Sequence, residues 1–186
     1  LEVIKRNFNL TLKDIPKNLK SKHWNIFNKK FKMIFTKDYD WENFLNNQEG
    51  STSIILWGKN LSNIKKKVIS SSVKQNLINE YKRLKRKIGY KFIKKYHEGK
   101  IGNPKSLKYE NLNINFRDIR SVYHAWKIKN ILEKRKNEKL IFLEIGAGVG
   151  LLSVKLKKIF PNAKIISIDL PEVNCLQHYY HSKALS

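Results

Sequence analysis

The stretch Leu140-Ile-Phe-Leu-Glu-Ile-Gly-Ala-Gly-Val-Gly150 decides the expected fold of this 186-residue chain. An apolar run ends in a glycine-rich turn, and residues 151–160 then follow the period of an amphipathic helix. Pro161 and Asn162 end that helix, and residues 164–169 form a second apolar run that closes on Asp169. The order strand, turn, helix, strand predicts one βαβ unit of a doubly wound, nucleotide-binding α/β sheet.

The turn carries the residue types that a bound nucleotide needs. Gly146, Gly148 and Gly150 allow a sharp turn and a close approach of the backbone to a ligand. Asp169 lies 19 residues beyond Gly150, where a carboxylate can accept hydrogen bonds from ribose hydroxyls. The spacing is G-x-G-x-G, whereas dinucleotide sites use G-x-G-x-x-G. Glu144, just before the turn, suits a cationic ligand and would repel a pyrophosphate.

Glu144, Gly146, Gly148 and Gly150 match the pattern E/D-x-G-x-G-x-G, and here the chain resembles the class I S-adenosylmethionine-dependent methyltransferases. The resemblance implies a Rossmann-like α/β core with S-adenosyl-L-methionine as cofactor. It also implies a cofactor site made of Glu144, Gly146, Ala147, Gly148, Gly150, Asp169 and Leu170. The alternative is a glycine turn in an α/β protein that binds no cofactor.

A narrower resemblance surrounds this motif. Asp169-Leu-Pro-Glu-Val173, Gln177-x-Tyr-Tyr180 and the segment 116–128 are similar to segments of sugar O-methyltransferases. This implies methyl transfer to a sugar hydroxyl, with a sugar or glycan acceptor in glycan or polysaccharide biosynthesis. Two alternatives stay open. One is a methyltransferase acting on RNA or another small molecule, and the other is a non-catalytic cofactor-binding partner.

The chain divides near residue 100 into two expected parts. Residues 1–100 form a helical N-terminal region, with helices over 24–34 and from Ser72 to before Gly99. Residues 101–186 form the start of the cofactor-binding domain, in which Asn115 begins a helix with Asp118 as its cap partner. Because the chain ends just after the second strand, we expect the front portion of a longer protein, inactive by itself. The catalytic base and any metal are expected beyond Ser186.

Net charge and cysteine content limit the kinds of partner and the cellular location to be expected. The formal net charge is +24, from 39 Lys and Arg against 15 Asp and Glu. Such a charge fits nucleic acid, but Lys far outnumbers Arg, and Asn and Ile are abundant, as AT-rich codons produce. The lysines are scattered rather than interleaved with exposed aromatic residues, so weak attraction to anionic glycans or membrane surfaces is favoured over nucleic acid. With one cysteine and no transmembrane run, the expected location is the cytoplasm.

Several other residues have expectations that the structure can test. His178 and His181 are spaced as a metal pair could be, but a solvent-facing helix is favoured and no metal site is proposed. Cys175 is expected to be buried. Tyr123 and Trp126 are expected to be core aromatics, with Arg120 or His124 at the cofactor pocket as an alternative. The catalytic residues and the oligomeric state are not determined.

Overall fold

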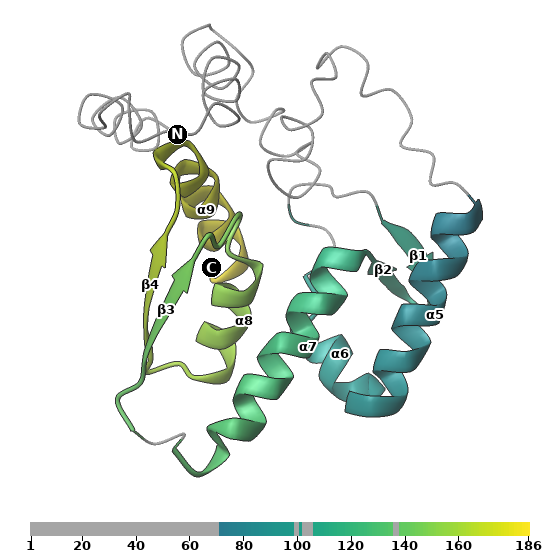
Figure 1. Ribbon diagram of the computed structural model, residues 1–186, viewed down its shortest axis with the longest axis horizontal. Coiled ribbons are helices and arrows are strands. Elements are labelled where there is room, and N and C mark those ends of the chain that lie inside the picture. The colour runs from purple at the N-terminus through teal and green to yellow at the C-terminus, as the bar shows by residue number, and fades with distance from the viewer. Residues whose placement is uncertain (1–70, 99–100, 102–105, 136–137) are drawn as a thin grey trace, which may run out of the picture.

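The computed structural model describes residues 71–98, 101, 106–135 and 138–186. The helix expected over 24–34, like the rest of residues 1–70, lies outside the described part. The described chain is mixed α/β, with two small sheets of two strands each. Its elements are, in order, α5 (Ser71–Ile88), α6 (Tyr90–Tyr96), β1 (Leu107–Tyr109), β2 (Leu112–Ile114), α7 (Phe116–Ile131), the 3-10 turn η3 (Glu133–Arg135), β3 (Ile141–Ile145), α8 (Leu151–Ile159), β4 (Lys164–Ile168) and α9 (Pro171–Ala184) (Figure 1).

The long helix expected after Ser72 is divided at Gly89. The apolar pattern continues from α5 into α6, but Gly89 has φ 81°, a left-handed conformation that glycine adopts readily. Its N–H still donates to the carbonyl of Lys85 at 3.0 Å, which closes the last turn of α5. The expectation of one continuous helix is therefore wrong. Periodicity alone does not reveal a change of axis that leaves the apolar face in phase.

The helical unit closes around its own core. β1 and β2 pair antiparallel, and Asn115 caps α7 as predicted, because its side chain accepts the Asp118 N–H at 2.9 Å. The core includes residues of α5, α6, β2 and α7, among them Leu77, Tyr81, Ile93, Ile114, Ile119 and Val122. These residues come from both sides of residue 100, where the sequence predicts a domain boundary, and that boundary stays a prediction.

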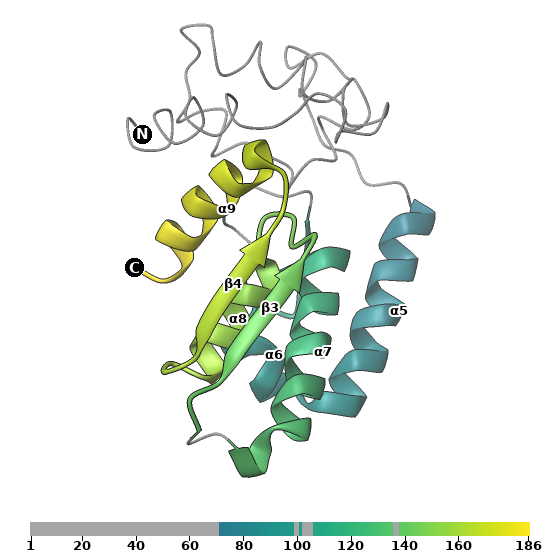
Figure 2. The same cartoon turned by 60° about the vertical axis from the view of Figure 1, so that its left-hand side comes forward.

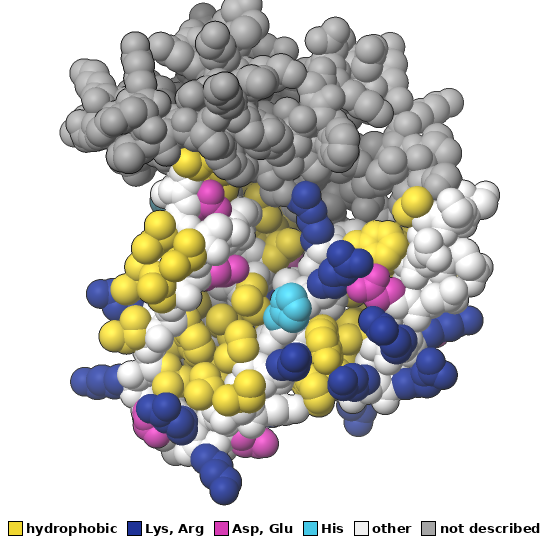
Figure 3. All heavy atoms as spheres, in the orientation of Figure 1, with side chains coloured by type: hydrophobic (Ala, Val, Ile, Leu, Met, Phe, Trp, Pro, Cys, Tyr) yellow, Lys and Arg dark blue, Asp and Glu magenta, His cyan; other side chains and the backbone are white. Residues whose placement is uncertain are grey.

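The second unit is the expected strand–helix–strand. β3 and β4 pair in parallel, from Ile141 opposite Lys164 to Ile145 opposite Ile168. Figure 2 shows α8 covering one face of this pair. The sequence predicts that these strands are buried on both faces. That prediction is wrong for the other face, where side chains are 38% to 75% exposed. These are Ile141, Leu143, Ile145, Ile166 and Ile168, and hydrophobic side chains gather over β3 and β4 in Figure 3.

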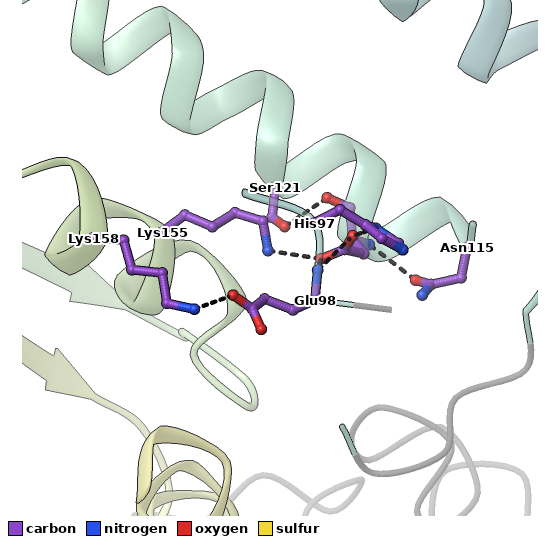
Figure 4. Close-up of polar contacts among 7 residues, drawn as sticks. His97, Glu98, Asn115, Ser121, Lys155 and Lys158 are labelled. Carbon is purple, nitrogen blue, oxygen red and sulfur yellow. Dashed lines mark hydrogen bonds and ion pairs between the residues drawn. The ribbon is translucent and has the colours of Figure 1, made fainter. Parts of the chain in front are cut away.

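A buried ionic cluster joins the two units. Asp118 of α7 pairs with the fully buried Lys155 of α8 at 2.7 Å, and His97, which follows α6, bonds the other carboxylate oxygen (Figure 4). Burial raises the pKa of Asp118, but Lys155 and His97 outweigh it and hold that pKa below its ordinary value. Glu98 adds an ion pair with Lys158. Helices far apart in the sequence are thus connected by charge as well as by packing.

The helices described here are too short or too polar to span a lipid bilayer.

Candidate functional site

The glycine turn lies at the carboxyl ends of β3 and β4. Parallel strands end at the same edge of a sheet, so the turn and the end of β4 meet there. Gly146 N–H donates to the carbonyl of Ile168 at 2.8 Å and continues the pairing beyond β3. Gly150 N–H donates to the carbonyl of Ala147 at 3.0 Å. The segment 146–150 is therefore a tight turn that leads directly into α8.

Asp169 holds this turn against the end of β4. Its carboxylate accepts the N–H of Gly148 through Oδ2 and the N–H of Leu170 through Oδ1, both at 2.8 Å. Three of the residues chosen from the sequence are thereby brought together. Each carboxylate oxygen can accept more than one hydrogen bond, so Asp169 can bind the turn and a ligand hydroxyl at once.

Glu144 lies beneath the turn, on the sheet face that α8 covers. It is half-buried, and its Oε2 accepts a hydrogen bond from Ser153 Oγ, which also lies 3.3 Å from Ser167 Oγ. Burial is the main cause that raises the pKa of Glu144; the bonds from Ser153 partly offset it, and the negative charge of Asp169 adds to the rise. Glu144 thus braces the start of α8 and contributes negative charge near the turn.

Sequence reasoning did not single out Ser153, although a signal for it exists. It is a polar residue in the first turn of α8, and it is 1% exposed. A serine that falls on the face turned toward the sheet needs a hydrogen-bond partner there. The carboxylate of Glu144, nine positions earlier, is that partner.

Gly150 is constrained by its backbone and by its neighbour. Its φ is +80°, and a Cβ atom at this position would overlap the imidazole of His181 on α9. His178 is exposed, as expected, but the expectation that His181 faces solvent is wrong. Burial lowers the pKa of His181, because α9 packs its imidazole against the turn.

The other residues chosen from the sequence lie elsewhere. Arg120 pairs with Glu80 of α5 at 2.9 Å, and His124 is exposed. Tyr123 and Trp126 are partly buried against the helical core, with ring centroids 6.1 Å apart, as expected for core aromatics. Cys175 is buried, also as expected. Within the described ranges, no three His, Cys, Asp or Glu residues are grouped so that they could hold a metal ion.

Comparison with known proteins adds no relative. No protein-family model, no curated protein and no solved structure matches this chain. The evidence for a function is therefore the geometry of the turn and the sequence pattern that forms it.

Proposed function

We propose that this protein is an S-adenosylmethionine-dependent O-methyltransferase with a Rossmann-like core, and that its acceptor is a sugar hydroxyl. The observation that carries the proposal is the glycine turn at the end of two parallel strands, joined by its Gly148 N–H to Asp169 of the second strand. In open α/β sheets ligands bind outside the carboxyl ends of the strands, and an acidic residue there binds ribose hydroxyls.

The charge around the turn fits S-adenosylmethionine better than a dinucleotide. Asp169 is close enough to Glu144 for its negative charge to help raise the pKa of Glu144. Two carboxylates favour a ligand with a sulfonium and an amino group, and they oppose the pyrophosphate of NAD. Asp169 would bind the ribose hydroxyls of the cofactor. The backbone of residues 146–150 would contact its methionine end, and Leu170 would lie beside its adenine.

The cofactor supplies a methyl group that is activated by its positively charged sulfur. The part of the chain described here would fix the position of that methyl group. Asp169 is itself held by two backbone N–H groups, and Glu144 by Ser153, so both carboxylates are positioned before a ligand binds. Such positioning lowers the entropic cost of aligning sulfur, methyl and acceptor oxygen.

Titration calorimetry with S-adenosylhomocysteine and with NAD tests the cofactor. We expect the full-length protein to bind the first and not the second. Tight binding of NAD with no binding of S-adenosylhomocysteine would refute the proposal. Methyl transfer by the full-length protein from labelled cofactor to glycan acceptors, with RNA as a parallel acceptor, tests the sugar. Transfer to RNA alone would support a methyltransferase but would show that its acceptor is RNA and not a sugar.

Asp169→Ala should weaken cofactor binding by roughly 1.5–3 kcal/mol, the range for a lost hydrogen bond to a charged group. In dissociation constant this is about ten- to 150-fold. Glu138→Ala is the control, because Glu138 pairs with Arg135 on the surface. Calorimetry of both variants, with thermal unfolding to confirm the fold, checks the prediction. Equal affinities for the two variants would show that Asp169 does not take part in cofactor binding.

A further inference from the structure

A cluster of positive charge surrounds one tyrosine where α5 and α7 lie side by side (Figure 1). Lys87 of α5 donates from Nζ to the hydroxyl of Tyr123 on α7 at 3.1 Å. The same Nζ lies 5.2 Å from the ring centroid of Tyr123, and the Nζ of Lys127 lies 5.5 Å from it. Arg83 lies one turn before Lys87, and we call these four residues the α5–α7 seam.

The seam lies in a strongly basic part of the surface. Residues 71–96 contain nine Lys or Arg and a single acidic residue, Glu80, whose carboxylate pairs with Arg120. Figure 3 shows Lys and Arg side chains gathered over α5, α6 and α7, in contrast to the hydrophobic side chains over β3 and β4. At the seam, Lys87 and Lys127 lie over the ring of Tyr123, which is partly buried against the helical core.

The positive charge at the seam lowers the pKa of the Tyr123 hydroxyl. The hydrogen bond from Lys87 is the main cause that lowers the pKa of Tyr123; burial opposes it, and the charges of Lys87, Lys127 and Arg83 add to the lowering. The ring of His124, the next residue on α7, lies 6.1 Å away between centroids. Negative charge is therefore favoured at this point of the surface. Lys87, Lys127 and Arg83 carry like charges that act on the same tyrosine, and a bound anion would reduce their mutual repulsion.

We propose that the α5–α7 seam is a binding site for a tetrahedral oxyanion, a phosphate or sulfate group carried by a ligand. The donors suit such a group. Lys87 uses one N–H on the tyrosine oxygen and keeps two, and the Tyr123 hydroxyl, which accepts from Lys87, keeps its own hydrogen to donate. Lys127 and Arg83, whose charges act on the same tyrosine, would supply further N–H groups. Charge-assisted hydrogen bonds are the strong ones.

The aromatic rings at the seam favour a single anionic group over single-stranded nucleic acid. Proteins that bind single strands stack bases on available aromatic faces. Here the ring of Tyr123 already interacts with Lys87 and Lys127, and it stacks with Trp126 at an interplanar angle of 16°. Recognition at the seam therefore rests on charge and hydrogen bonds, which a phosphate or sulfate group satisfies by itself.

The test uses the 186-residue chain with inorganic phosphate and a hexose phosphate as probes, at constant ionic strength with chloride. Binding is followed through tyrosinate absorbance during a pH titration, because a bound anion should shift the ionisation of Tyr123 to higher pH. Lys87→Gln should weaken phosphate binding by about fivefold, as expected for losing one exposed, charge-assisted contact. Tyr123→Phe, which keeps the ring, should abolish the shift in absorbance.

Lys94→Gln is the matched control, because Lys94 is an exposed lysine of α6 outside the seam. Its phosphate affinity should stay within about twofold of the unmodified chain, since a single distant surface charge has little effect. An equal loss in both variants, or no loss in Lys87→Gln, would overturn the proposal. Vesicles with phosphatidic acid test a lipid source of the phosphate, and loss of their binding in Lys87→Gln would support the same site.

RNA binding that is unaffected by Lys87→Gln, with no binding of either phosphate probe, would also overturn the proposal. The experiment contains no methyl donor. Its result is therefore independent of the proposed methyl transfer.

Discussion

The helical unit α5–α7 and the β3–α8–β4 unit bury their apolar residues in different ways. The first closes three helices and a hairpin around a core cluster of ten buried residues, whereas the cluster between α8 and one face of the sheet has three, Leu156, Phe160 and Ala163. The other sheet face leaves five aliphatic side chains exposed. The comparison suggests a division of roles. The helical unit has the larger buried core, and the βαβ unit presents the glycine turn that we propose binds the cofactor.

The largest expected effect breaks the connection between the two units. Asp118→Ala leaves the fully buried ammonium of Lys155 without its partner, and breaking a buried ion pair in this way costs about 3–5 kcal/mol. Urea unfolding measures the loss. Glu138→Ala, which breaks the exposed pair with Arg135, should cost less than about 1 kcal/mol. A loss no larger in Asp118→Ala than in this control would show that the two units do not depend on the buried cluster.

The second prediction compares the two faces of the βαβ unit. Leu156 is 3% exposed between α8 and the sheet, so Leu156→Ala should reduce the free energy of unfolding by about 2–5 kcal/mol. Leu143 is 59% exposed on the open face, so Leu143→Ala should cost less than about 1 kcal/mol. Chemical denaturation of both variants measures the difference. Equal losses would mean that the open face is covered in solution.

The third prediction concerns the turn itself. Gly150→Ala places a Cβ against His181 at a positive φ, which combines about 1–2 kcal/mol of backbone strain with about 1–3 kcal/mol of overpacking. Gly146→Ala is the matched control, since Gly146 also has a positive φ (+70°) but nothing within 4 Å of its Cβ position. Only the strain should remain in that variant. Thermal unfolding that ranks the two equally would show that α9 does not rest on the turn.

The smallest expected effect is a pH dependence from Glu144. Its pKa is raised chiefly by burial, so the folded state holds this proton more tightly than the unfolded state does. Stability should therefore fall as pH rises from near the ordinary glutamate value through the raised pKa. Glu144→Gln should flatten that part of the profile by about 1 kcal/mol or less, one pKa unit being 1.4 kcal/mol. Urea midpoints between pH 4 and 7 check this, and an unchanged slope would contradict it.

The parts of the fold that sequence predicted are local. The cap of α7 by Asn115 depends on residues three positions apart, and the order of strand, turn and helix around the glycines follows from adjacent apolar runs and turn residues. Asp169 is expected at the ligand from its position at the end of the second strand, 19 residues beyond Gly150. It lies beside the turn because parallel strands end at the same edge of a sheet. The sequence did not predict the break between α5 and α6 at Gly89, because the apolar pattern of α5 continues into α6.

The sequence by itself determined the secondary structure of the βαβ unit and the residues of its glycine turn, since short-range periodicity and backbone preference are written in neighbouring residues. Only the tertiary structure decided which distant side chains meet. Lys155 finds Asp118 from 37 positions away, and Lys87 finds Tyr123 from 36. The sequence shows which residues are charged, and therefore what kind of group each can bind. It does not show which distant residue each one contacts in the folded chain. The packing of α5, α7 and α8 supplies those partners, because a buried charge is stable only where an opposite charge is packed against it.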